Sequence, residues 1–100
     1  MLRILLLTAG SIGLAAPAFA GTLFTAALSE PVADGTEIIA NRAIWTCEGD
    51  VCVAELSRKT PSVRSCKKVA KEIGQLAGFS SENGELTAEE LDECNTAAKG

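Results

Sequence analysis

Short runs of apolar and β-branched residues, separated by turn residues, divide the first half of the chain into strands. The first run covers 22–29, and the second covers 37–47 with a bulge or a break expected at Asn41. Gly49 and Asp50 then form a two-residue hairpin turn, because glycine accepts the positive φ that such a turn needs. We therefore predict three antiparallel strands, the third of which follows this turn.

Counting outward from the turn places Cys47 opposite Cys52, in a pair close enough for a disulfide. The same register divides the hairpin into two faces. The face that we expect in the core carries Ala43, Trp45, Cys47, Cys52, Ala54 and Leu56. The outward face carries Ile44, Thr46, Glu48, Val51, Val53 and Glu55.

After Pro61 the apolar residues recur at steps of three and four, which predicts a helix. Thr60 or Ser62 serves as its N-cap, and Gly78 ends it. Gly74 either weakens the interior of this helix or lets a neighbour approach closely. Its apolar face comprises Val63, Cys66, Val69, Ala70, Ile73, Leu76 and Ala77.

A polar loop, residues 80–85, leads to a second helix that extends to about Ala98. Thr87 and Glu90 form a capping box at its start. The predicted fold class is therefore α+β: a three-stranded antiparallel meander followed by a two-helix hairpin that packs on the Trp45 face. Two disulfides are expected to cross-link it.

Residues 1–20 have the pattern of a removable signal peptide. Arg3 precedes an apolar stretch of about 13 residues, shorter than the roughly 20 that span a bilayer. A small-x-small motif ends at Ala20, so we expect cleavage between Ala20 and Gly21. The prediction is a single mature domain, 21–100, in the periplasm or secreted, with no stable membrane insertion after cleavage.

All four cysteines follow this signal and are expected to oxidise. Of the three possible pairings, the hairpin favours Cys47 with Cys52, which leaves Cys66 with Cys94. In the chain-entropy model the longer loop contributes roughly 3.6 kcal/mol and the shorter one about 2 kcal/mol. The gaps of four, thirteen and twenty-seven residues do not fit a zinc site, and we expect neither a metal nor a cofactor.

A redox role for Cys47 and Cys52 is the alternative hypothesis, because a short disulfide can be labile. Their spacing is Cys-x₄-Cys rather than Cys-x-x-Cys, and neither precedes a helix that would stabilise a thiolate. The neighbouring Glu48 and Asp50 disfavour a thiolate further. We therefore prefer a structural role for this pair.

Composition excludes several classes of function. The chain contains no His and no Tyr, which removes Ser-His-Asp and Cys-His catalysis and histidine metal sites. Without Arg3, the mature chain has eight basic and thirteen acidic residues, a net charge of −5. This balance argues against nucleic acid as a partner, because phosphate binding needs a basic surface.

Charge is nevertheless segregated along the chain. Six basic residues lie within 58–71: Arg58, Lys59, Arg64, Lys67, Lys68 and Lys71. Six acidic residues accompany the second helix: Glu82, Glu85, Glu89, Glu90, Asp92 and Glu93. The basic run is either a patch for an anionic ligand or lipid head group, or a solvated helix face that favours pairing with the acidic helix. We prefer the second interpretation.

Three sequence features carry a resemblance: Ile44-Trp45-x-Cys47-Glu48-Gly49-x-x-Cys52-Val53, Cys66, and Leu91-x-x-Cys94-Asn95. In these the chain resembles a small family of exported alphaproteobacterial proteins of unknown function, with a W-x-C-x-G-x-x-C segment and two further cysteines. The resemblance implies a periplasmic or secreted setting. It implies no activity.

We expect a non-enzymatic interaction module whose partner is an unidentified envelope protein or ligand. Ile44, Val51 and Val53 on the outward hairpin face form the expected contact surface, since an exposed strand edge favours pairing. The sequence predicts no catalytic residue and no particular oligomeric state.

Overall fold

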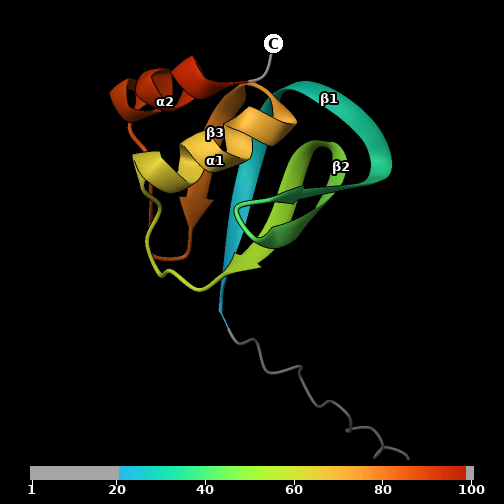
Figure 1. Ribbon diagram of the computed structural model, residues 1–100, viewed down its shortest axis with the longest axis horizontal. Helices are drawn as coiled ribbons and strands as arrows, with labels where there is room; N and C mark the ends of the chain where they lie inside the picture. Colours follow the sequence, from blue (N-terminus) through green and yellow to red (C-terminus); the bar gives the residue numbers. More distant parts are fainter. Residues whose placement is uncertain (1–20, 99–100) are drawn as a thin grey trace, which may run out of the picture.

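A four-stranded antiparallel sheet and two helices form the protein in a computed structural model that describes residues 21–98 (Figure 1). The predicted signal peptide lies outside the described residues. The strand order is β2-β1-β3-β4, with the strands β1 Thr22–Ala40, β2 Ala43–Leu56, β3 Leu76–Ser81 and β4 Gly84–Glu85. The helices are α1 Val63–Ile73 and α2 Ala88–Cys94, the latter continued by the 3₁₀ turn η2 Asn95–Ala97.

β1 and β2 form one long hairpin whose tight turn is at Asn41-Arg42. Both residues have positive φ, 53° and 63°, which is the conformation that a type I′ turn needs and that asparagine tolerates. The predicted strand 37–47 is therefore wrong, because the turn divides it between β1 and β2. The break expected at Asn41 is confirmed.

This hairpin folds back on itself, as Figure 1 shows by the curve of both strands. Cys47 and Cys52 lie 4.0 Å apart at their Cα atoms, whereas five residues of extended strand would separate them by about 16 Å. The chain reverses at the predicted position, with Gly49 at a φ of 64°. However, β2 continues through Gly49-Asp50 and both of its halves pair with β1, so the predicted two-residue turn between separate strands is wrong. Residues 28–35 of β1 lie opposite the much shorter segment 48–50 of β2. β1 therefore follows the outside of the bend.

The two predicted faces of the hairpin are confirmed. Trp45, Cys47, Cys52, Ala54 and Leu56 are buried, while Ala43 is half-buried. On the other face Ile44, Thr46, Glu48, Val51 and Glu55 are exposed, while Val53 is half-buried. Alternation of side chains across the backbone thus determines which residues enter the core.

Three aromatic rings form the centre of the core. The Phe79 ring lies 5.5 Å from that of Phe24 and 6.2 Å from that of Trp45, between ring centroids. The buried Trp45 indole donates its Nε1 hydrogen to the carbonyl oxygen of Ala40, at 3.0 Å. Because its one donor is satisfied, the indole can be buried without a desolvation penalty.

α1 is shorter than the sequence pattern predicts. Ser62 caps its start by accepting a hydrogen bond from the Ser65 N–H, and the helix ends at Gly74 rather than Gly78. Gly74 has a φ of 119°, which is incompatible with a helix. The chain then continues as β3, a strand that the sequence analysis missed because Leu76 and Ala77 prolong the helical period.

β3 pairs with β1, and Phe79 lies opposite Ala26. The sheet consequently has four strands rather than the three of the predicted meander, and β4 occupies part of the expected loop 80–85. The capping box between Thr87 and Glu90 is confirmed. α2 ends at Cys94, before the predicted end at Ala98, and η2 follows it.

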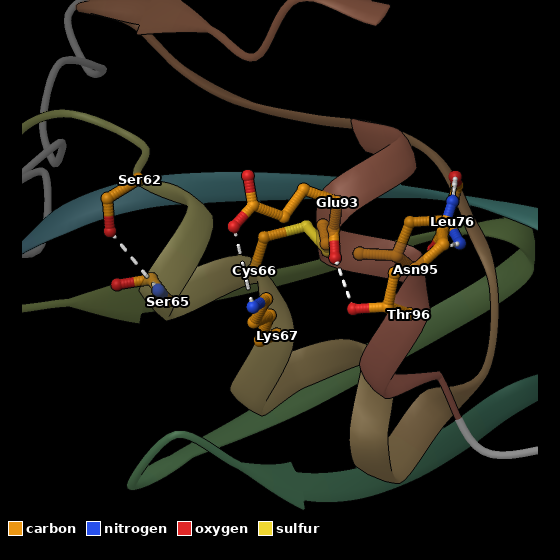
Figure 2. The surroundings of a disulfide bond; sticks show 9 residues. Ser62, Ser65, Cys66, Lys67, Leu76, Glu93, Asn95 and Thr96 are labelled. Carbon is orange, nitrogen blue, oxygen red and sulfur yellow. Dashed lines mark hydrogen bonds and ion pairs between the residues drawn. A yellow bond between two sulfur atoms is a disulfide. The ribbon is translucent and has the colours of Figure 1, made fainter. Parts of the chain in front are cut away.

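The second disulfide, Cys66–Cys94, joins α1 to α2 (Figure 2). Both predicted pairings are thus present, and both lie in the core. Figure 1 shows α1 lying across β1 with α2 beside it. Among residues 21–98, no helix is sufficiently long and apolar to cross a membrane.

Candidate interaction surface

Large apolar side chains are exposed on the outward face of the β1–β2 hairpin. The exposed fractions are 71% for Ile39, 60% for Ile44, 48% for Leu23 and 41% for Val51. Exposed apolar residues are common singly, but a contiguous group often marks an interaction site. The question is therefore which of these residues lie together.

The register of the hairpin brings most of them to one place. Ile39 is the cross-strand partner of Ile44, and Leu23 lies opposite Glu55. The fold of the hairpin then places both pairs on one open groove of about 670 Å³. Its lining residues are Leu23, Ile39, Arg42, Ala43, Ile44, Thr46, Val53, Ala54 and Glu55. We call this the hairpin groove.

The structure brings together two of the three residues predicted for this surface. Ile44 and Val53 both line the hairpin groove, whereas Val51 is exposed at the bend and is not among the lining residues. Ile39 and Leu23 were missed. The Asn41-Arg42 turn is the sequence feature that could have identified Ile39 as part of this surface, because a turn at that position makes residue 39 the cross-strand partner of residue 44.

The strand segment 36–40 adds a strand edge to this surface. It pairs with β2, whereas the pairs between β1 and β3 involve residues 24–28. Within the described residues, this segment is thus a sheet edge that carries the exposed Ile39. Glu55 and Arg42 supply one charge of each sign among the lining residues.

The Cys47–Cys52 disulfide lies in the core, away from solvent. Both residues have an exposed fraction of 0%, and so do Cys66 and Cys94. Exchange requires a thiolate to reach one sulfur atom, so access to either disulfide requires local opening of the fold. The described residues contain no group of three or more His, Cys, Asp or Glu that could hold a metal ion.

A family model matches residues 8–96 of the chain. The chain belongs to DUF8200, a family of unknown function. The DUF8200 match covers all four cysteines and every residue that lines the hairpin groove. No curated protein and no solved structure matches the chain.

A second surface of this DUF8200 protein is the basic side of α1. Its buried residues, Ser65, Cys66, Val69 and Ala70, occupy one side of the helix. At 100° per residue, the opposite side carries Arg64, Lys67, Lys68 and Lys71. We call these four residues the basic face.

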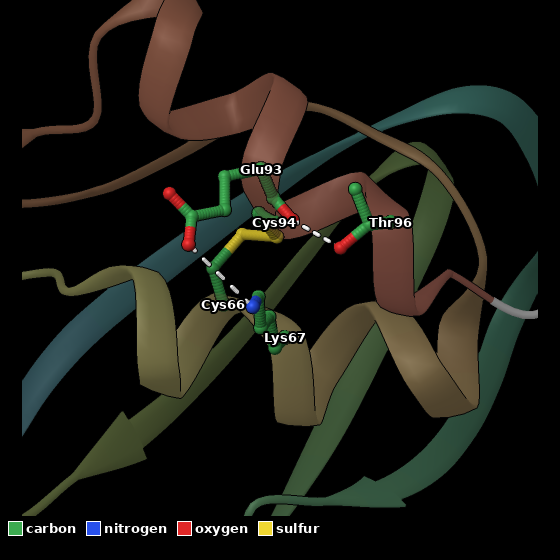
Figure 3. Close-up of polar contacts among 5 residues, drawn as sticks. All are labelled: Cys66, Lys67, Glu93, Cys94 and Thr96. Carbon is green, nitrogen blue, oxygen red and sulfur yellow. Dashed lines mark hydrogen bonds and ion pairs between the residues drawn. A yellow bond between two sulfur atoms is a disulfide. The ribbon is translucent and has the colours of Figure 1, made fainter.

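The predicted pairing between basic and acidic helices involves one residue of the basic face. Lys67 Nζ lies 3.7 Å from Glu93 Oε2, beside the Cys66–Cys94 disulfide (Figure 3). With side chains 39% and 65% exposed, this ion pair contributes little to stability. No ion pair is found for Arg64, Lys68 or Lys71 within the described part of the chain.

The basic face opposes the stability of its own helix. Its residues form four like-charged pairs at spacings of three and four, which together cost about 1–2 kcal/mol. Glu72, four residues after Lys68, and the position of Lys71 in the last turn offset this cost in part. α1 has no acidic residue in its first turn, where Arg64 also opposes the helix dipole. In contrast, α2 has Glu89 and Glu90 at that position. Ion pairing between α1 and α2 therefore explains little of why α1 carries these four basic residues.

Proposed function

We propose that this DUF8200 protein is an exported, non-enzymatic interaction module and that the hairpin groove is its contact surface. The observation that carries the proposal is the exposure of Ile39 and Ile44, which are cross-strand partners at the tip of a folded hairpin. Burial of both by a partner would remove a large apolar area from water. An extended segment of an envelope protein is the expected ligand.

The sheet edge at 36–40 supports strand addition as the binding mode. Backbone hydrogen bonds to this edge would supply affinity, and apolar side chains at alternate positions of the ligand would fill the groove. The signal pattern and two disulfide bonds in a small domain support an oxidising compartment as the place of action.

The complete burial of Cys47 and Cys52 weighs against the alternative of a thiol-disulfide protein. A native redox disulfide would release thiols when the folded protein meets glutathione. We expect none to be trapped by a thiol reagent until urea unfolds the protein. Rapid trapping at Cys47 or Cys52 in the folded state would favour the redox alternative.

The groove can be tested by photo-crosslinking in cells that express the protein. A photoreactive amino acid at position 39 is expected to crosslink to one envelope protein, and Ile44→Ser is expected to abolish that product. The matched control is Val51→Ser, a similar loss of an exposed apolar side chain outside the groove. A product that persists in Ile44→Ser would contradict the proposed surface.

A further inference from the structure

The basic face of α1 stands out against the charge of the rest of the protein. Residues 58–71 contain six of the eight basic residues that follow position 20, and all thirteen acidic residues lie elsewhere. Arg42 and Lys99 are the remaining basic residues. The molecule is therefore strongly anionic except over α1 and the segment that precedes it.

This charge arrangement makes the protein an electrostatic dipole with one cationic side. An anionic surface attracts that side and repels the remainder, so the encounter is oriented. Glu72, the single acidic residue of α1, borders the basic face. The packed neighbour α2 carries the exposed Glu89, Glu90 and Asp92 in addition to Glu93, which contacts Lys67. Among residues 21–98, the other three cations of the basic face form no ion pair.

The shape of the basic face indicates an extended ligand rather than a small anion. Its four cations project from the convex side of one helix, within about 10 Å along the axis. The hairpin groove and the hollow beside Gly74 are lined by other residues. A flat, densely charged surface that meets several lysines at once fits this geometry.

We infer that the basic face of α1 binds the head-group phosphates of an anionic lipid bilayer. Each Lys or Arg near such a surface strengthens binding about fivefold, and the attraction disappears within a Debye length. The binding surface is separate from the hairpin groove, so the two interactions can fail independently. On this inference, the like charges that weaken α1 are present because they bind a ligand.

The test uses the exported protein, purified in its oxidised form after signal cleavage. Sedimentation with vesicles of equimolar phosphatidylglycerol and phosphatidylcholine is expected to carry down the protein at low salt. Binding is expected to vanish in about 1 M salt, where the Debye length is about 3 Å, and with phosphatidylcholine alone. Arg64→Gln/Lys68→Gln should weaken binding about 25-fold, from fivefold per charge.

Two controls separate this binding from other effects. Arg42→Gln removes one charge from another surface and should change binding less than Lys68→Gln does. Ile39→Ser/Ile44→Ser alters the hairpin groove and should leave vesicle binding unchanged. Arg64→Gln/Lys68→Gln should also unfold at an equal or higher temperature, because it removes like-charge repulsion, whereas a structural role for these residues predicts a lower one.

Three outcomes would overturn the inference. One is the absence of salt-sensitive binding to phosphatidylglycerol vesicles. Another is equal binding by wild type and Arg64→Gln/Lys68→Gln. The third is binding to a soluble polyanion such as polyglutamate without binding to vesicles, which would assign the basic face to an acidic polymer.

Discussion

At the scale of single residues, Asn95 connects the end of the chain to the sheet. Its side-chain oxygen accepts a hydrogen bond from the Leu76 N–H at 2.8 Å, and its amide nitrogen donates to the Leu76 carbonyl at 2.9 Å (Figure 2). The amide thus satisfies both backbone groups of the first residue of β3. One side chain thereby replaces a strand partner.

Asn95→Asp is expected to lower the free energy of unfolding by about 1–3 kcal/mol near neutral pH, because a carboxylate cannot donate to the Leu76 carbonyl. Urea unfolding followed by the fluorescence of Trp45, the single tryptophan, measures the change. Asn83→Asp is the matched control, since the exposed Asn83 amide nitrogen donates one hydrogen bond, to the Lys59 carbonyl. Equal losses in the two variants would contradict the role of Asn95.

At the scale of elements, two local conformations decide where strands and helices end. Asn41-Arg42 reverses the hairpin with two positive φ angles, and Gly74 ends α1 with a third. Apolar residues continue on both sides of each position, so the sequence pattern predicts one strand across Asn41-Arg42 and one helix across Gly74. Backbone conformation at a few residues therefore determines the number of strands.

Gly74→Ala is expected to cost about 1–2 kcal/mol, because the residue keeps a left-handed φ in which a Cβ is strained. No atom lies within 4 Å of the position of the added Cβ, so the cost is conformational rather than a steric clash. Gly78→Ala is the control: its Cβ would meet that of Ala27 at 3.5 Å, an ordinary contact. A neutral Gly74→Ala with increased helical circular dichroism would show that the helix extends instead.

At the scale of the whole molecule, the two disulfides act on different lengths of chain. Cys47–Cys52 closes the bend of one hairpin, whereas Cys66–Cys94 joins helices that are separated by β3 and β4. Both pairs are fully buried. A small domain has a limited core, so these cross-links supply a large share of its net stability.

Cys66→Ala/Cys94→Ala is expected to destabilise the protein more than Cys47→Ala/Cys52→Ala, by about 3.6 against about 2 kcal/mol in the chain-entropy model. Each variant removes two buried sulfur atoms, so the difference reports loop length. Urea unfolding of both variants under one buffer condition measures it. A greater loss in the hairpin variant would show that geometry at the bend outweighs loop entropy.

The candidate surface was partly predictable from the sequence. Register counting identified Ile44 and Val53 as outward-facing, because side chains alternate along a strand. Leu23 was not identified, because its proximity to Ile39 and Ile44 depends on how the hairpin folds over. Helical spacing in the sequence predicted the basic face. Only the structure showed that one of its residues, Lys67, forms an ion pair with the acidic helix.

By itself the sequence determined the α+β class, the buried and exposed faces of the hairpin, both cysteine pairings and the two helix starts. Most of these depend on local periodicity and capping, which act over a few residues, whereas the pairing of Cys66 with Cys94 followed by elimination once Cys47 was paired with Cys52. The tertiary structure alone decided that Leu76–Ser81 is a strand and that Leu23 joins Ile39 in one groove. Both depend on contacts between segments distant in sequence, where the energy of pairing and packing overrides local propensity.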